Sequence, residues 1–571
     1  MPTQCPRRRT AAPSPLLALA AAVLALAGCG SSSSPGSSAD PASVVPAAAA
    51  LYAGATVRPT GAEKTAALAA GKALTHEADP YVRLLAALQT PGSPQLDYQR
   101  EVAPWLGAHA GIFLTSLSSS SSALLALVRQ GLLGGSASSA FPFGGSVQGA
   151  IVLDTTNVDA ARSFLHTQAQ HAGAHASSYK GVAFQTTSAG VAFGIVDRFA
   201  VIGSEAGLRS VIETTLDGSS LAHASSYSTL LAAAPANALA HIYASPPNSA
   251  AGAPAEGASG LLGLLAGTRQ ANISLVPSES SLAIDADTLA AGSTSAGSGG
   301  LLAADPQGAQ AFAELPGESW LAIGLGHIGT SLSQDVQGLQ ALTSLGSTLG
   351  GGGPESSAGL SLNGLLQGLT TPLSALGAST PQARHDFASW MGPAGIFASG
   401  SSLLELKGAV AIASTNPALS RAAVAELGDQ LRKGGSSVAS VSIAGTEAAI
   451  SAKVSGLPVV LDIADGRDAA GQAKFVLGIG EASVQEALKP SSTLATASSS
   501  AAATSALGEG TKPSLSVDFP TLLSLLEGIG LTESPSLSKV VPYMRSATTL
   551  AGGGRALSSA VDRFKLVLGL Q

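Results

Sequence analysis

One cysteine carries the most specific chemistry in this sequence. Cys29 closes the segment Leu26-Ala27-Gly28-Cys29, which follows an apolar run over residues 16–27 and three arginines at residues 7–9. A positive stretch, an apolar run of about 7–15 residues and small residues before a cut site are typical of an export signal peptide. The run is also shorter than the ~20 apolar residues that span a bilayer.

The position of Cys29 resembles a bacterial lipobox, where diacylglycerol is attached to the cysteine sulfur, the chain is cleaved before that residue and the new N-terminus is acylated. We predict that residues 1–28 are removed and that Cys29 is lipidated. Residues 30–38 are almost all Gly and Ser, so residues 29–44 should form a flexible tether. Two or three acyl chains hold a protein at a membrane more firmly than one. The alternative is an ordinary signal peptide that ends near an unrelated cysteine.

A glycine pattern at residues 324–329 (Gly-Leu-Gly-His-Ile-Gly) matches G-x-G-x-x-G and follows an apolar stretch. A dinucleotide fold also needs an acidic residue that ends a second strand about 20 positions later. The chain runs instead into four glycines at residues 350–353. We therefore interpret the pattern as chance in a glycine-rich chain and predict no bound cofactor.

Three histidines lie close together at His166, His171 and His175, and the last two have the i, i+4 spacing that can hold a metal on a helix. Gly173 lies between them and is expected to end that helix. We therefore predict a solvated helix end and no metal site.

Five aspartates form two groups. Asp285 and Asp287 lie on one face of an expected strand, and Asp462, Asp465 and Asp468 surround an expected turn at Asp465-Gly466. Grouped carboxylates can bind calcium or act as acid and base. Carboxylates at strand ends and turns are usually solvated, so we expect both groups to be exposed; a functional site is the alternative.

The remaining motifs predict no catalytic residue. The serines lack a G-x-S-x-G elbow and no lysine has the P-loop spacing. Trp105 and Trp390 recur with flanking glycines, and we expect both to pack in a core.

Composition limits the classes of partner. Charged residues make up 11% of the chain, against about 25% in typical soluble domains, and aromatic residues 4%. Loss of the three arginines in residues 1–28 lowers the formal net charge from −7 to −10. An acidic chain without basic runs is poorly suited to nucleic acid and is repelled by anionic headgroups. We predict no nucleic-acid partner and membrane contact through the lipid anchor.

Four segments recur in the same order in the two halves of the chain, which indicates a tandem duplication. The pairs are residues 46–54 with 316–324, 105–113 with 390–397, 149–162 with 408–421, and 199–212 with 475–488.

Each copy should contain the same series of elements. We expect strands that begin at Leu51 and Leu321, a helical region that leads to the tryptophan segment, and a strand followed by a helix capped by Thr-Asn. Two further strands, a helix that begins at Glu205 or Glu481, and a final hairpin complete the copy. Strands joined by hairpins and interrupted by helices predict an α+β fold with a largely antiparallel sheet, present in two tandem copies.

These motifs resemble a known family. The opening proline and strand, Pro-Trp-Leu-Gly at residues 104–107, a strand followed by Thr-Asn-x-x-x-x-Arg, and Phe-x-x-x-Gly-Ser/Gly-Glu are similar to a bacterial envelope family catalogued as domain of unknown function 3352. The likeness covers most of the mature chain, although the second copy has Ala-Ser in place of Pro before Trp390. It implies an envelope location and the fold; the family has no established activity, so no catalytic residue is transferred.

We divide the chain into a signal peptide (1–28), a tether (29–44), a first domain (45–291), a linker (292–311) and a second domain (312–571). We expect an extracytoplasmic lipoprotein that acts as a non-enzymatic scaffold or binding module of the envelope, with an envelope protein or an apolar ligand as partner.

Two alternatives remain. Leucine-rich segments at residues 124–133, 261–265 and 360–376 suggest a carrier of lipid or another apolar ligand. Lipidation and size suggest a solute receptor for a transporter. An enzyme is the least favoured class.

Overall fold

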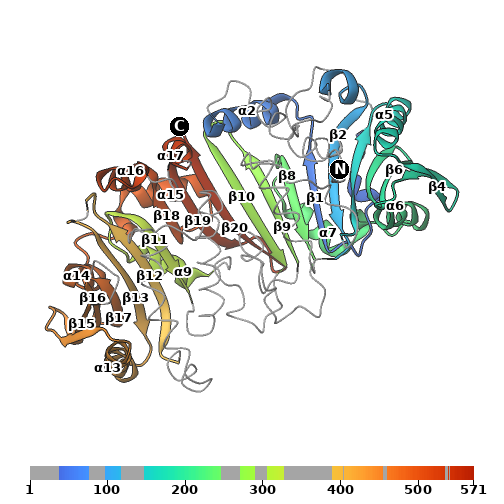
Figure 1. The fold of residues 1–571 in the computed structure, drawn as a ribbon. Helices are drawn as coiled ribbons and strands as arrows, with labels where there is room; N and C mark the ends of the chain where they lie inside the picture. The colour runs from blue at the N-terminus through green and yellow to red at the C-terminus, as the bar shows by residue number, and fades with distance from the viewer. Residues whose placement is uncertain are drawn as a thin grey trace, which may run out of the picture. The chain divides into compact units, whose positions relative to one another are not determined.

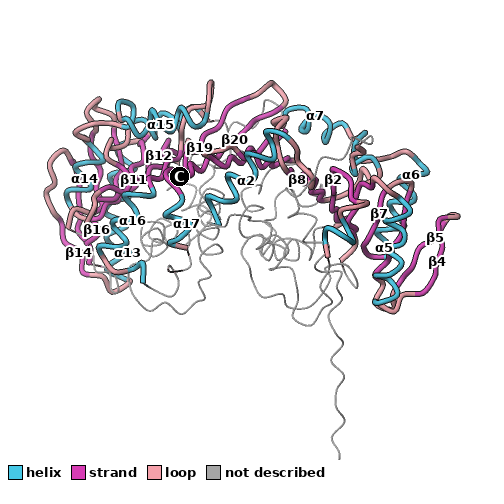
Figure 2. Tube along the Cα trace, turned by 90° about the horizontal axis from the view of Figure 1, so that it is seen from above, coloured by secondary structure: helices cyan, strands magenta, loops and turns pink. Residues whose placement is uncertain are grey.

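The chain divides into two compact units, each with helices packed on an antiparallel sheet. The computed structural model describes residues 38–75, 97–116, 147–245, 270–289, 305–326, 389–402, 404–453, 460–533, 538 and 540–571. Unit 1 comprises residues 1–257 and 269–279, and unit 2 comprises residues 258–268 and 280–571. Helices and strands occur in both units (Figures 1 and 2), which confirms the predicted α+β class with a largely antiparallel sheet.

Several predicted features lie outside the described residues: the signal peptide, Cys29, most of the tether and linker, and the three leucine-rich segments. Within the described part of the chain, no helix combines the length and apolar character needed to cross a membrane.

The described strands of unit 1 run in the order β9-β8-β1-β2-β3-β7-β6-β5-β4, with antiparallel neighbours throughout. The strands are β1 (Leu51–Thr56), β2 (Leu106–Leu114), β3 (Gly149–Thr155), β4 (His175–Tyr179), β5 (Val182–Thr186), β6 (Val191–Val196), β7 (Phe199–Ser204), β8 (Ala240–Ala244) and β9 (Ala271–Pro277). The helices and helical turns are η1 (Pro41–Ser43), α2 (Gly61–Thr75), η2 (Tyr98–Val102), α5 (Val158–His171), α6 (Glu205–Asp217), η3 (Leu221–His223) and α7 (Ser225–Ala233).

The described strands of unit 2 run in the order β10-β20-β19-β18-β11-β12-β13-β17-β16-β15-β14, again antiparallel. The strands are β10 (Ser281–Leu289), β11 (Ser319–Leu325), β12 (Met391–Ser399), β13 (Lys407–Ser414), β14 (Ser437–Ser440), β15 (Thr446–Lys453), β16 (Val460–Arg467), β17 (Ala473–Ile479), β18 (Leu515–Asp518), β19 (Ala547–Ala556) and β20 (Val561–Leu570). The helices and helical turns are α9 (Pro306–Ala313), α13 (Pro417–Lys433), α14 (Glu481–Leu488), η6 (Leu494–Thr496), α15 (Ser498–Leu507), α16 (Phe519–Gly528), η7 (Leu531–Glu533) and α17 (Val541–Ser546).

Three of these elements lie across the predicted boundaries. Strand β10 was predicted as the second strand of the hairpin that closes the first copy; it pairs with β20 along its whole length and lies in unit 2. Residues 41–43 were expected to be part of the flexible tether, but they form the turn η1, with Pro41 and Ala42 buried. Residues 306–311 were expected to be linker, but they form most of helix α9. Asp305 caps that helix by accepting a hydrogen bond from the Gln307 N–H at 2.8 Å, and Pro306 fits its first turn.

The Thr-Asn motif caps the predicted helix in both units. The Asn157 side-chain oxygen accepts a hydrogen bond from the Ala160 N–H at 3.0 Å and begins α5. The Asn416 oxygen accepts bonds from the N–H groups of Ala418 and Leu419 and begins α13. Helices α6 and α14 begin at Glu205 and Glu481, as predicted.

The two recurring tryptophans pack in the core, as predicted. Trp105 and Trp390 are each 1% exposed. The Trp105 ring lies 5.3 Å from the Phe164 ring, and the Trp390 ring lies 5.2 Å from the Phe475 ring. The Trp390 carbonyl also accepts hydrogen bonds from Thr415, so the tryptophan segment is fastened to the strand that precedes the capped helix.

Two hairpins were not predicted. The pairs β4–β5 and β14–β15 extend the far edge of each sheet, and their residues are largely polar or small and partly exposed. The turn predicted at Asp465-Gly466 is also wrong: both residues lie within β16, and the chain turns instead around Asp468 and Gly471.

Candidate functional site

The clearest candidate site is a solvent-open pocket of about 220 Å³ in unit 1, over strands β1, β2 and β8. Tyr52, Gly54 and Thr56 alternate along β1 and therefore share one face. Because residues directly opposite in antiparallel strands point to the same side, His241 on β8 faces Gly54, and His109 on β2 faces Thr56. The sheet register thus brings two imidazoles and a phenol to one surface.

Asp40 closes one side of the pocket. It caps the short turn η1, where its carboxylate accepts a hydrogen bond from the Ala42 N–H at 2.9 Å. The same carboxylate is hydrogen-bonded to the Tyr52 hydroxyl. Burial, and then the charge of Asp40, raises the pKa of Tyr52 well above its ordinary value, so this phenol stays protonated.

His241 is held neutral behind Tyr52. Burial lowers its pKa to about 4, and the nearby Asp40 only partly opposes that effect. The His241 Nε2 is 3.1 Å from the Tyr227 hydroxyl of α7, and its ring centroid is 5.6 Å from that of Tyr52. Tyr227 also packs edge-on against Tyr52 and Tyr243, at 5.9 and 5.3 Å. The floor of the pocket is therefore a packed aromatic group.

A second carboxylate lies beside the pocket. Glu63, on α2, is hydrogen-bonded to Thr56 and interacts electrostatically with His109. Burial raises the pKa of Glu63, and the other two interactions act in the opposite direction. In the part of the chain that the structure describes, no group of three His, Cys, Asp or Glu is arranged to hold a metal ion. The arrangement is suited to binding a small polar molecule.

The pocket exists because the segment that covers β1 is short. In both units the covering segment begins with Asp-Pro, at the start of η1 in unit 1 and of α9 in unit 2. Each segment ends at a proline that forms an isolated β-bridge, Pro46 or Pro316. Residues 40–46 span six positions, whereas residues 305–316 span eleven, enough for helix α9. In unit 2 that helix fills the region that is open in unit 1.

The glycine pattern at residues 324–329 has a packing role where it is described. A Cβ on Gly324 would collide with the Gly308 carbonyl of α9 and come within 2.6 Å of the Phe312 nitrogen. Gly324 therefore lets α9 lie directly on β11. The remaining residues of the pattern, 327–329, lie outside the described residues.

The three clustered histidines are exposed, as expected for a helix end. Helix α5 ends at His171, and Gly173 follows with a positive φ of 67°. His166 is hydrogen-bonded to Gln170 and Gln185, at 2.9 and 2.6 Å.

The first aspartate pair is buried, which contradicts the expected solvent exposure. Asp285 and Asp287 are 3% and 0% exposed. Arg563, opposite on β20, binds Asp287 through two hydrogen bonds at 2.6 and 2.8 Å and lies 3.1 Å from Asp285. These two ion pairs of Arg563 fix the register of β10 on β20, because a shift of one residue would place the charges on opposite faces of the sheet.

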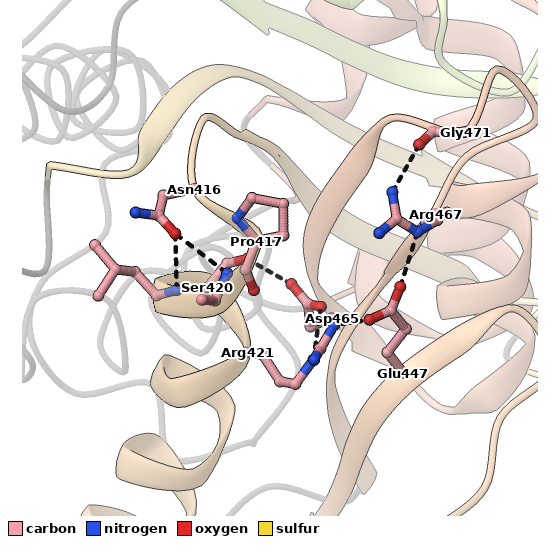
Figure 3. A network of polar contacts seen from close by, with 10 residues as sticks. Asn416, Pro417, Ser420, Arg421, Glu447, Asp465, Arg467 and Gly471 are labelled. Atoms are coloured by element: carbon pink, nitrogen blue, oxygen red, sulfur yellow. Dashed lines mark hydrogen bonds and ion pairs between the residues drawn. The ribbon is translucent and has the colours of Figure 1, made fainter.

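Asp462 and Asp465 of the second aspartate group are also buried, at 5% and 1% exposed, against the expected exposure. As Figure 3 shows, the buried Ser420 hydroxyl of α13 donates to the Asp465 carboxylate at 2.5 Å, and the Arg421 Nε lies 3.8 Å away. Burial raises the pKa of Asp465, and the hydrogen bond and the arginine charge oppose that rise.

The charge network continues to the surface. Arg421 also pairs with Glu447, whose other oxygen is 2.8 Å from the Arg467 Nε (Figure 3). Asp468 accepts hydrogen bonds from the N–H groups of Ala470 and Gln472. These contacts fasten α13 to β16 and order the following turn, so we interpret the network as structural.

A hollow of about 370 Å³ in unit 2 is less suited to a ligand. Lys407, Glu486 and Lys489 contribute charges of both signs to its wall, and Lys407 is already 3.2 Å from Glu486. The pair of Lys407 and Glu486 therefore leaves Lys489 as the one unbalanced charge among these three.

Sequence reasoning missed the pocket in unit 1. Asp40, Tyr52, His109 and His241 are far apart in the chain and meet only through strand pairing. One difference in the sequence could have indicated the pocket. The segment from the Asp-Pro pair to the proline that begins the first repeated segment is shorter in the first half (Asp40 to Pro46) than in the second (Asp305 to Pro316).

Both the fold and the sequence can be compared with known proteins. The family described as "Protein of unknown function (DUF3352)" matches residues 11–528, so the chain belongs to that family. No curated protein matches the chain. A solved structure titled "Structure of crystal form I of TP0453" is similar over 45% of this chain and 82% of that one, with 9% identity and a TM-score of 0.24. Similarity at this level supports no argument about function.

Proposed function

We propose that this chain is a lipid-anchored extracytoplasmic protein that acts as a non-enzymatic binding module of the cell envelope. The observation that favours binding over a purely structural scaffold is the open pocket at Asp40, Tyr52 and His241. Its counterpart region in unit 2 is filled by α9. One unit thus keeps a covered sheet while the other leaves polar groups facing solvent.

The anchor is the thioether-linked lipid on Cys29. The arginines, the apolar run and the Leu-Ala-Gly-Cys segment support this assignment. Acylation, rather than a basic surface, would hold a chain of formal net charge −10 at an anionic membrane, since its own charge opposes adsorption.

We also propose that the two units are tandem copies of one domain. The four repeated segments support this, and so does the matching strand path, in which β1, β2, β3 and β7 correspond to β11, β12, β13 and β17. The Asn157 and Asn416 caps occupy equivalent positions in that path.

The anchor is tested by Cys29→Ala, with Cys5→Ala in the discarded peptide as the matched control. We expect Cys29→Ala to leave the membrane fraction or remain uncleaved, while Cys5→Ala fractionates as the wild type. Mass spectrometry of the mature N-terminus should give a diacylglyceryl-modified Cys29. A Cys29→Ala chain that is cleaved and still fractionates with the membrane, or an unmodified thiol on the mature wild-type N-terminus, would refute the anchor.

The second candidate function is transport of an apolar ligand, which the three leucine-rich segments suggest. Native mass spectrometry of the detergent-extracted protein tests it: co-purified lipid would favour a carrier over the polar binding module proposed above.

A further inference from the structure

We infer that the pocket of unit 1 binds the ammonium group of a small organic cation, with Asp40 as the counter-ion and the partly exposed ring of His241 as the apolar surface. The inference deepens the proposed binding role and does not depend on the lipid anchor. All of the groups involved belong to the described part of unit 1.

The charge around the pocket favours a cation. Asp40 lines it and Glu63 lies beside Thr56 at its edge, so two carboxylates face the region. His241 is neutral near pH 7, because burial lowers its pKa to about 4, and it therefore adds no opposing charge. An anionic ligand would have to approach both carboxylates.

The shape and the surface favour an organic ammonium over a bare metal ion. A volume of about 220 Å³ lies below the roughly 300–1,000 Å³ of drug-sized sites, so it suits a molecule of a few heavy atoms. The partly exposed, uncharged ring of His241 can pack against the alkyl groups of such a cation, and Tyr52, which is only 1% exposed, supports that ring at 5.6 Å between centroids. The described residues present no metal-binding group of three ligands.

The comparison with unit 2 indicates that the opening follows from specific differences between the two units in sequence. Tyr52 occupies the position of Ala322, and its ring lies over the two glycines Gly54 and Gly111. In unit 2 the equivalent glycines, Gly324 and Gly395, are covered by α9 and the residues that follow it. A shorter covering segment and a larger aromatic residue together leave a walled, polar space where unit 2 has a packed helix.

The test uses the purified full-length chain and choline as the probe, observed by saturation-transfer NMR and by shifts of the histidine ring protons. We expect saturable binding with a dissociation constant on the order of tens of millimolar, as for one solvent-exposed ion pair and one ring contact. The uncharged isostere 3,3-dimethylbutan-1-ol should bind about fivefold more weakly, and acetate should not bind.

Two variants locate the site. Asp40→Asn keeps a capping side chain but removes the charge, so it should weaken choline binding about fivefold. Asp305→Asn makes the same change at the matching cap of α9 and should leave binding unchanged. Ala238→Trp places a large ring in the pocket wall and should abolish binding while circular dichroism remains that of the wild type.

The inference is overturned if choline does not saturate, if the uncharged isostere binds equally well, or if Asp40→Asn and Ala238→Trp both bind as the wild type does. None of these results would alter the outcome of the Cys29→Ala experiment, so the two proposals fail separately.

The ammonium group can be free or part of a lipid headgroup. Sedimentation of the Cys29→Ala chain with phosphatidylcholine vesicles, compared with phosphatidylglycerol vesicles, distinguishes these sources. Cosedimentation that is lost in Asp40→Asn assigns the site to a headgroup, and binding of choline alone assigns it to a free solute.

Discussion

Corresponding faces of the two sheets are covered differently in the two units. In unit 2, helix α9 lies on β11 so closely that Gly324 has no room for a Cβ. In unit 1, the corresponding segment is five residues shorter, and β1 is covered by Tyr52, His241 and solvent. A shorter covering segment, together with Tyr52 in place of Ala322, thus accompanies a polar pocket where unit 2 has a packed face, while the order of the strands beneath is the same.

The largest effect on stability should come from the tryptophan that each unit buries in its core. Trp105→Ala and Trp390→Ala each remove a fully buried ring, and we expect each to lower the free energy of unfolding by about 4 kcal/mol. Denaturant unfolding followed by circular dichroism measures both. Leu419→Ala, at a side chain that is 44% exposed, is the control and should cost less than about 0.5 kcal/mol. A large loss in one tryptophan variant alone would break the equivalence of the units.

Replacement of the glycine under the covering segment should destabilise unit 2 more than unit 1. In Gly324→Ala the new Cβ meets backbone atoms of α9, so we expect a loss of about 3 kcal/mol. In Gly54→Ala it meets the ring of His241 at 2.7 Å and the Tyr52 hydroxyl at 3.0 Å, which can shift toward the pocket, so we expect about 1 kcal/mol. Hydrogen exchange in β11 and β1 locates the two effects. Equal losses would mean that β1 is as tightly covered as β11.

The last effect concerns the titration of His241 and appears only as the pH falls below about 6.5. Its folded-state pKa is about 4, below the ordinary 6.5, so the unfolded chain takes up a proton first as the pH falls. Stability should therefore be lost between pH 6.5 and 4, by up to about 3 kcal/mol. Asp40, His109 and Tyr227 are the titratable groups around this ring.

The measurement compares the wild type with His241→Gln, which keeps a hydrogen-bond acceptor for Tyr227. The variant should lose less stability over the same pH range in urea unfolding. Parallel curves for the two proteins would show that the imidazole is not held neutral by the fold.

Sequence patterns predicted the elements whose causes are local. The Asn157 and Asn416 caps, the helices that begin at Glu205 and Glu481, and the buried tryptophans all follow from side-chain chemistry within a few residues. The edge hairpins were missed because β4 and β14 are short, polar and partly exposed, and so lack the apolar alternation that marks a strand.

The buried charges and the pocket could not be predicted in this way. Asp287 is buried because Arg563 lies opposite it in a strand 276 residues away, and nothing near Asp287 in the sequence indicates that partner. Asp465 was expected in a turn because Asp-Gly is a turn signal, but its bond to Ser420 keeps it inside β16. Local patterns do not report such partners, because strand register decides which distant residues meet.

The position of Asp40 near the proposed acylation site has a geometric consequence. Asp40 lies eleven positions after Cys29, and a fully extended chain covers at most about 3.5 Å per residue. Once acylated, the protein would therefore hold its carboxylate-lined opening within roughly 40 Å of the bilayer. Anionic headgroups enrich small cations within about 10 Å of the surface. The tether would thus let the opening reach this cation-rich layer, which lies well inside its range of roughly 40 Å.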